Sequence, residues 1–214
     1  MTDPSTSRRS RGRAQARANT TVPQRPWAQP VMRFAPVDSV TADELDEIHR
    51  VSLEILERIG MEVLDPEARS IFRSAGCNVD EHTMRVRIPG DVVERAVAAA
   101  PPSFVLHSRN PDRHLVFGER RLIFGTVCST PNAVDRNGVR RVGDRAAMQE
   151  LLKVAQGLDV IHLVSGYPVE PTDLHFSIRH LEAGWDILTL TDKGFPCYSL
   201  GRQRNRDCIE MARI

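Results

Sequence analysis

The sequence has few aromatic residues and no paired-cysteine motif. Phe, Trp and Tyr make up only 5% of the 214 residues, so the core must be mainly aliphatic. The four cysteines are widely spread and form no C-x-x-C pair, which excludes a zinc ribbon and a thioredoxin-type motif. A disulfide framework is not expected in a chain of this size, so free thiols and a cytoplasmic location are the simplest expectation.

Long hydrophobic runs and glycine-rich fingerprints are also missing. No run of about 18 apolar residues occurs, and the N-terminus lacks the apolar centre of a secretory signal, so no membrane segment is expected. The first apolar strand lacks G-x-G-x-x-G, which argues against a dinucleotide site. Ser129 does not lie in a G-x-S-x-G elbow, and Cys128 has no base nearby in the sequence, so neither is expected to act as a nucleophile.

The net charge of +1 hides an uneven distribution. Residues 1–33 contain seven Arg and one Asp, whereas the remainder has 22 Lys plus Arg against 27 Asp plus Glu. Pro, Ser, Thr and Arg dominate residues 1–36, which are therefore predicted to form a disordered tail. Nucleic-acid binding through these arginines, or an organelle presequence, is less favoured than a solvated tail.

Residues 37–118 are predicted to form a small α+β module. Thr41 and Glu44 have the spacing of a capping box at the start of a helix that Gly60 ends. Asp65 followed by Pro66 is typical of a second helix start. A third short helix is expected from Asp91, and short strands are expected at 61–64, 84–88, 104–108 and 114–118.

Residues 119–214 show a different, repeating pattern. Apolar strands are expected to begin at 121, 160 and 195, intervals of 39 and 35 residues, and helices are expected at 144–157, 173–190 and from 205. Such spacing is typical of parallel strands with helical crossovers, as in a doubly wound sheet or a (β/α)8 barrel. We favour an α/β fold that contains the first three units of a TIM barrel. Asn137-Gly138 adds a hairpin after the first strand.

The end of the chain suggests that the barrel is partial. The last helix has no Gly, Pro or capping residue after it, and a barrel needs eight βα units. We therefore expect the chain to be the N-terminal part of a longer protein. A natural smaller fold remains the alternative.

Candidate site residues follow the first two barrel strands. In a barrel, chemistry lies at the carboxyl ends of the strands. Cys128 and Ser129 follow the first strand, and Tyr167 and Glu170 follow the second. A tyrosine ring can bind a quaternary ammonium group, and Glu170 with Asp173 could serve as an acid–base pair or hold a cation. Helix capping is favoured for Asp173 and stays open for Glu170, and for Tyr167 an ordinary position at the rim is favoured over an aromatic box.

Two other polar residues are expected to be structural. His162 lies inside an apolar strand, with no second His or Cys at ligand spacing, so metal binding is not expected. Lys193 enters the third strand at the end of the barrel opposite the chemistry, where a role in stability is expected.

Several stretches resemble the trimethylamine methyltransferase family of corrinoid-dependent enzymes. The similar segments occur in the family's order and cover about residues 42–214. They are residues 49–80 (HRVSLEILERIGMEVLDPEARSIFRSAGCNVD), 86–118, 158–174 (LDVIHLVSGYPVEPTDL), 179–202 and 208–214 (CIEMARI). The loop GTVCSTPNAVD after the first strand is less glycine-rich than is usual in the family.

The resemblance implies a TIM barrel and a specific reaction. A methyl group would pass from a tertiary or quaternary methylated amine, such as trimethylamine or glycine betaine, to cob(I)alamin on a separate corrinoid protein. The catalytic position, pyrrolysine in trimethylamine enzymes, would lie in later strands, so the catalytic residue is unknown. Cys128, Ser129, Tyr167 and Glu170 are the substrate-binding candidates. A homo-oligomer stays open, as does the alternative of a truncated, non-catalytic interaction protein of the same fold.

Overall fold

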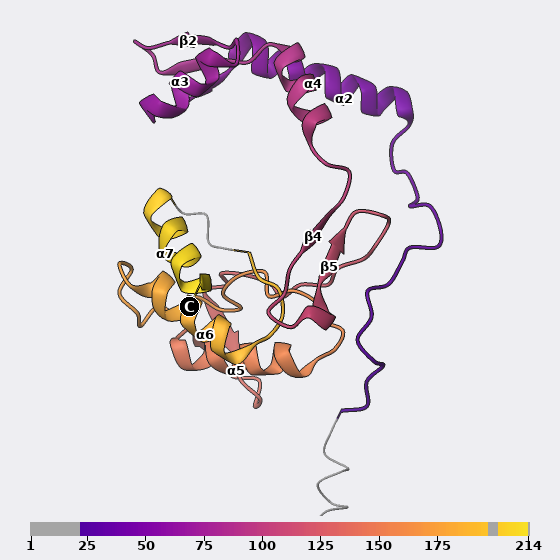
Figure 1. Ribbon diagram of the computed structural model, residues 1–214, viewed down its shortest axis with the longest axis vertical. Coiled ribbons are helices and arrows are strands. Elements are labelled where there is room, and N and C mark those ends of the chain that lie inside the picture. Colours follow the sequence, from indigo (N-terminus) through magenta and orange to yellow (C-terminus); the bar gives the residue numbers. More distant parts are fainter. Residues whose placement is uncertain (1–21, 197–200, 214) are drawn as a thin grey trace, which may run out of the picture. The chain divides into compact units, whose positions relative to one another are not determined.

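The computed structural model describes residues 22–196 and 201–213 (Figure 1). The chain divides into two compact units, one containing residues 32–104 and the other residues 22–31 and 105–213. None of the helices in the described parts is both long enough and apolar enough to cross a membrane.

The unit of residues 32–104 consists of three helical segments and a small antiparallel sheet. Its helices are α2 (Ala42–Glu54), continued by the π-helical turn η1 (Ile55–Ile59), α3 (Pro66–Ser74) and α4 (Gly90–Ala99). The sheet has the order β1-β3-β2 and is formed by β1 (Met61–Glu62), β2 (Asn78–Asp80) and β3 (Arg85–Arg87). The strand β2 was not predicted from the sequence.

The predicted helix signals of this unit are confirmed. The Thr41 hydroxyl accepts from the Glu44 backbone N–H, and the Glu44 carboxylate accepts from the Thr41 N–H at 2.8 Å, so both halves of the capping box form. Asp65 caps α3 through a 2.8 Å bond from the Ala68 N–H. Gly60 ends the first helix at φ 69°, a conformation that favours glycine.

The second unit contains two hairpin-like pairs and three helices. The pairs are β4 (Phe104–Leu106), which begins at the boundary, with β5 (Leu115–Phe117), and β6 (Asn132–Val134) with β7 (Arg140–Val142). A 3-10 turn, η2 (Pro111–Arg113), lies between β4 and β5. The helices are α5 (Arg145–Gly157), α6 (Arg179–Leu190) and α7 (Arg202–Arg213); α6 packs against both of the others (Figure 1).

The three predicted barrel strands meet in sequence order and in parallel. Single parallel bridges join Gly125 to Leu163 and Leu163 to Gly194. The segments form bridges and not long ladders, and residues 197–200 of the third predicted strand lie outside the described residues. The part of the chain that the structure describes thus forms a mixed α/β arrangement without a closed barrel, and the parallel order agrees with successive βα units.

The second unit has an aliphatic core, as the shortage of aromatics predicts. The buried residues come from β6, the α5 and α6 helices and the loop after the second parallel segment. They are Ala133, Ala147, Met148, Leu152, Val164, Tyr167, Val169, Ala183 and Ile187. The helices α5 and α6 are thereby fixed against the segment that leads into residues 164–169.

Residues 22–31 fall within the predicted tail, yet they are bound to the second unit. The Gln24 side chain donates to the Gly157 carbonyl and accepts from the Asp159 N–H. The Gln29 side chain bonds both the N–H and the carbonyl of Val116. These amide bonds, together with the edge-to-face contact of the Trp27 ring with His162, hold this segment, and composition records neither of them.

The helix expected over 173–190 begins six residues later than predicted. Residues 172–178 form turns, and α6 starts at Arg179. The Arg179 guanidinium donates to the Leu174 carbonyl from two nitrogens, at 2.8 and 3.2 Å. These bonds stabilise the turns at residues 172–178, where helical periodicity alone predicted a continuous helix.

Candidate functional site

The loops after the first two parallel segments are joined by a series of hydrogen bonds. The Thr126 N–H donates to the Leu163 carbonyl at 3.0 Å, and the Ser165 N–H donates to the Thr126 hydroxyl at 3.1 Å. One step further, the Ser129 N–H donates to the Tyr167 carbonyl at 2.6 Å. The strand-end residues that were predicted to share one rim therefore lie side by side.

The same series continues to Glu170. The Glu170 N–H donates to the Thr130 carbonyl at 2.9 Å, and the Thr130 hydroxyl donates to the Pro168 carbonyl at 3.0 Å. We call the paired loops, residues 125–130 and 163–170, the rim. The rim places Cys128, Ser129 and Glu170 on adjacent backbone segments.

Two glycines allow the close approach of these segments. A Cβ on Gly125 would lie 2.2 Å from the Ser165 hydroxyl oxygen. A Cβ on Gly143, which follows β7, would lie 2.4 Å from the Glu170 carbonyl oxygen. The Gly143 carbonyl also accepts from the Thr172 hydroxyl at 2.8 Å. The sequence contains these glycines, but only the paired loops show that a side chain at these positions would contact the neighbouring segment.

The rim residues differ in how they are exposed. Cys128 is exposed and free of a disulfide. Ser129 has φ 54°, a left-handed conformation that costs a non-glycine residue of order 1 kcal/mol and is often found at functional loops. The Tyr167 ring is only 4% exposed and belongs to the core, so Tyr167 supports the rim through its carbonyl. A role of these residues in substrate binding stays a prediction.

Glu170 is the acidic group of the rim. Its Oε1 forms an ion pair with Arg179 Nη1 at 2.7 Å, and both side chains are 24% exposed. Its Oε2 has no hydrogen bond to any other described residue. Sequence reasoning missed Arg179 because a spacing of nine residues across a turn is not a recognised pairing distance. Arg179 therefore compensates the charge of the Glu170 carboxylate, and Oε2 keeps an open acceptor position.

Asp173 acts as a cap, but for another helix. Its Oδ1 accepts from the Arg145 N–H at 2.8 Å, at the first residue of α5. Asp144 caps the same helix through a 2.7 Å bond from the Ala147 N–H, as predicted. Asp173 thus stabilises α5 and is not paired with Glu170 as an acid and a base.

His162 has a structural environment, as expected. Its side chain is 1% exposed, Nδ1 accepts from the Phe124 N–H at 3.0 Å, and Nε2 donates to the Ala28 carbonyl at 3.1 Å. The bond to Nδ1 requires the neutral ring, and burial lowers the pKa of His162. His162 therefore fastens residues 22–31 to the first parallel segment.

Lys193 is buried at the end of α5. Its Nζ donates to the Ala155 carbonyl and, at 2.7 Å, to the Leu158 carbonyl, which lie in the last turn of the helix and just beyond it. Lys193 is only 2% exposed. Burial is the main cause that lowers the pKa of Lys193, to about 8, and the positive charge of nearby Arg113 lowers it further.

Among the described residues, no group of three or more His, Cys, Asp or Glu is arranged to hold a metal ion.

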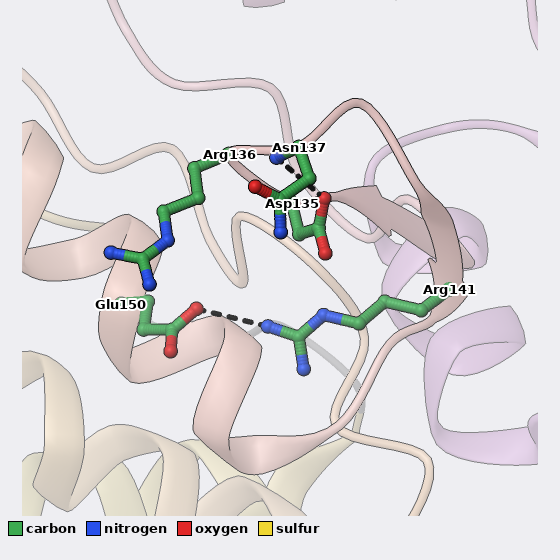
Figure 2. Close-up of a pocket in the computed structure, with 5 residues that line it drawn as sticks. All are labelled: Asp135, Arg136, Asn137, Arg141 and Glu150. Carbon is green, nitrogen blue, oxygen red and sulfur yellow. Dashed lines mark hydrogen bonds and ion pairs between the residues drawn. The ribbon is translucent and has the colours of Figure 1, made fainter.

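A polar pocket of about 690 Å³ adjoins the β6–β7 hairpin (Figure 2). Its lining residues are Asp135, Arg136, Asn137, Arg141 and Glu150. Figure 2 shows Arg136 and Arg141 extending toward Glu150, and Arg141 Nη2 pairs with the Glu150 carboxylate at 2.9 Å. The two arginines and the two carboxylates of this pocket balance in charge.

A family model described as trimethylamine methyltransferase matches residues 6–214. The chain belongs to the trimethylamine methyltransferase family. It is 31% identical over 175 residues to a glycine betaine methyltransferase of Desulfitobacterium hafniense (strain Y51), covering 82% of the chain and 36% of that protein. It is 33% identical over 152 residues to a trimethylamine methyltransferase of Desulfitobacterium hafniense (strain DSM 10664 / DCB-2), covering 71% of the chain and 30% of that protein.

A shorter region is more similar to relatives from Methanosarcina. Over 70 residues the chain is 50% identical to a trimethylamine methyltransferase of Methanosarcina mazei, which covers 33% of the chain and 14% of that protein. The chain spans about a third of the length of the Desulfitobacterium relatives it matches. It therefore corresponds to only part of a methyltransferase of this family.

Proposed function

We propose that the full-length protein transfers a methyl group from a tertiary or quaternary methylated amine to cob(I)alamin carried by a corrinoid protein. The observation that carries this proposal is the family match, which extends over residues 6–214. Relatives named for two different methylated amines, trimethylamine and glycine betaine, support the substrate class. The corrinoid enters as the second substrate, presented by a partner protein.

The reaction sets clear tasks for the protein. The Co(I) electron pair forms a bond to the methyl carbon while the carbon–nitrogen bond breaks and its electrons remain on nitrogen. The leaving amine is neutral only if the donor nitrogen begins as a quaternary or protonated cation. The protein must hold this cation in line with the acceptor and exclude water. Positioning and exclusion of water together bring most of the rate gain in such transfers.

The rim offers groups for the first of these tasks. We assign the available Oε2 of Glu170 to the charge of the amine, since a carboxylate attracts a cation strongly at a partly buried position. Cys128 and Ser129 would line the same site with small side chains that leave room for N-methyl groups. The Tyr167 carbonyl holds the Ser129 backbone in place.

A direct assay tests the proposal. The full-length protein, cob(I)alamin kept reduced by a chemical reductant, and a panel of methylated amines are mixed without oxygen, and the corrinoid absorbance is followed. We expect conversion to methylcobalamin with at least one of trimethylamine and glycine betaine. No conversion with any amine, on free or protein-bound corrinoid, would favour the alternative of a non-catalytic interaction protein.

Glu170→Gln should weaken binding of the amine. Loss of the carboxylate charge at a site 24% exposed is expected to raise KM for the amine by about tenfold, with a smaller change in kcat. Steady-state kinetics with the amine as the varied substrate measures both constants. The matched control is Glu210→Gln, which removes an exposed carboxylate that pairs with Arg213 on α7.

A second variant separates cation binding from loop support. Arg179→Met breaks the same ion pair but keeps the Glu170 carboxylate, so KM for the amine should stay equal or fall. If Arg179→Met raises KM as much as Glu170→Gln does, the ion pair supports the loop and Glu170 does not bind the substrate.

A further inference from the structure

Residues 22–31, which we call the strap, are held on the second unit by a small number of bonds. The Gln24 and Gln29 side chains each make two hydrogen bonds to backbone groups of the unit. The Leu122 N–H donates to the Pro30 carbonyl at 2.8 Å. The strap contributes none of the buried residues of the aliphatic core. It is therefore a part of the second unit that can open while the core stays folded.

One titratable side chain, His162, connects the strap to the parallel segments. Its Nε2 donates to the Ala28 carbonyl of the strap at 3.1 Å, and its Nδ1 accepts from the Phe124 N–H at 3.0 Å. The Trp27 ring meets the His162 ring edge-on, with the ring centroids 5.9 Å apart. The imidazole thus lies between the strap and the first parallel segment.

A proton on Nδ1 is incompatible with this arrangement. The nitrogen that accepts from the Phe124 N–H would become a second donor, so two N–H groups would face each other. The cation would also lie in a side chain that is only 1% exposed, where an unpaired charge is costly. Burial lowers the pKa of His162 more than the bond to the Ala28 carbonyl raises it.

The charged groups around His162 do not compensate this cost. Lys193, beside the third parallel segment, repels a proton on the ring. Arg25 of the strap and Asp159, two residues after α5, line the same pocket as His162 and carry opposite charges. Asp159 already pairs with Arg113 at 3.4 Å. The charge around the ring therefore disfavours an imidazolium.

We propose that the strap is a proton-sensitive latch, in which protonation of His162 releases residues 22–31 from the parallel segments. Once the strap has moved away, water can reach the ring and solvate the cation. Closure of the strap is therefore fully favoured above about pH 6.5, the ordinary pKa of the ring, and weakens as the pH falls below it. The closing equilibrium changes by at most about tenfold for each pH unit.

Release of the strap leaves the parallel segments joined. The His162 N–H donates to the Phe124 carbonyl at 2.8 Å, a backbone bond that does not involve the ring. Next to it, the Thr126 N–H donates to the Leu163 carbonyl at 3.0 Å. Acid should therefore open the strap while the first and second segments stay paired at the rim.

Amide hydrogen exchange in the full-length protein tests the latch. Three N–H groups of the second unit donate to the strap, those of Val116, Leu122 and Asp159. From about pH 7.5 to about pH 5.5, their protection factors, corrected for the intrinsic pH dependence of exchange, should fall by up to about tenfold. The protection of the Thr126 N–H should stay constant. Constant protection of the three strap-bound amides, or an equal fall at Thr126, would overturn the proposal.

His162→Gln removes the titrating group and keeps an N–H donor for the Ala28 carbonyl. Whatever its level at about pH 7.5, protection of the strap-bound amides in this variant should not change down to about pH 5.5. His175→Gln is the matched control, because His175 is exposed and bonds only within its own turn, to Ser177. The control should keep the wild-type pH dependence. The same fall in wild type and His162→Gln would show that another group operates the strap.

A variant of the strap gives an independent test that leaves His162 in place. Gln24→Ala/Gln29→Ala removes four hydrogen bonds of the strap and neither side-chain bond of His162. Closure and protonation oppose each other, so a weaker strap must allow His162 to take up its proton at higher pH. Nuclear magnetic resonance of histidine-labelled protein follows this titration, and an unchanged midpoint would overturn the latch. None of these measurements uses methyl transfer, so their outcome is separate from that of the proposed function.

Discussion

Gly143→Ala is expected to lower the free energy of unfolding by roughly 3 kcal/mol, the upper end of the usual cost of overpacking, because the site cannot relax. The new Cβ would lie 2.4 Å from the Glu170 carbonyl oxygen and 2.5 Å from Val169 Cγ2. Val169 is fully buried, and Glu170 is held by the Thr130 carbonyl through its own N–H. Neither group can move without breaking the rim. Urea unfolding followed by circular dichroism measures the change.

Gly157→Ala is the matched control for Gly143→Ala. A Cβ on Gly157, the last residue of α5, would meet no atom within 4 Å. The same chemical change should therefore leave stability within about 0.5 kcal/mol of the wild type or raise it slightly. Equal urea midpoints for the two variants would show that the rim does not have the tight contact described here.

Stability should rise with pH between about 8 and 10.5 because of Lys193. Its pKa is about 8 in the folded protein against the ordinary value of 10.5, so the unfolded chain binds more protons across this interval. Unfolding free energy increases with pH wherever the unfolded state holds more protons. The contribution from Lys193 is on the order of 3 kcal/mol over the interval and is absent below it.

Lys193→Met isolates this contribution. The variant loses the bonds to the Ala155 and Leu158 carbonyls and is expected to be less stable at high pH, but it has no amine to titrate. The difference in unfolding free energy between wild type and variant should therefore grow as the pH rises from 8 to 10.5. A constant difference over that interval would mean that Lys193 keeps an ordinary pKa in the folded protein.

Local signals in the sequence predicted local structure well. The capping box at Thr41, the caps at Asp65 and Asp144, and the hairpin at Asn137-Gly138 all form. Each depends on interactions within about five residues, which a sequence pattern records directly. The parallel order of the three strand segments also followed from spacing, because a helical crossover needs a minimum length.

Contacts between distant residues could not be predicted in the same way. The Gln24 bonds to Gly157 and Asp159 join positions more than 130 residues apart, so composition alone assigned this segment to a tail. The ion pair of Glu170 with Arg179 and the turn that delays α6 depend on one guanidinium that makes three hydrogen bonds to two acceptors. Such pairings are set by tertiary packing and leave no periodic signal.

The candidate site was predicted in part. The two loops that were expected to share one edge are joined by hydrogen bonds from Thr126 to Glu170. The burial of Tyr167 was not foreseen, because a tyrosine at a strand end can face either the core or the solvent. The close approach to the Glu170 backbone, which requires glycine at 143, became evident only from the paired loops.

Transfer of a labelled methyl group is the most direct test of the proposed function. Trimethylamine and glycine betaine with trideuterated methyl groups are incubated with the full-length protein and reduced corrinoid, and the corrinoid is analysed by mass spectrometry. We predict that the label moves intact to cobalt from at least one of the two amines and that the demethylated amine forms in equal amount. Unlabelled corrinoid after incubation with both amines would contradict the proposed methyltransferase function.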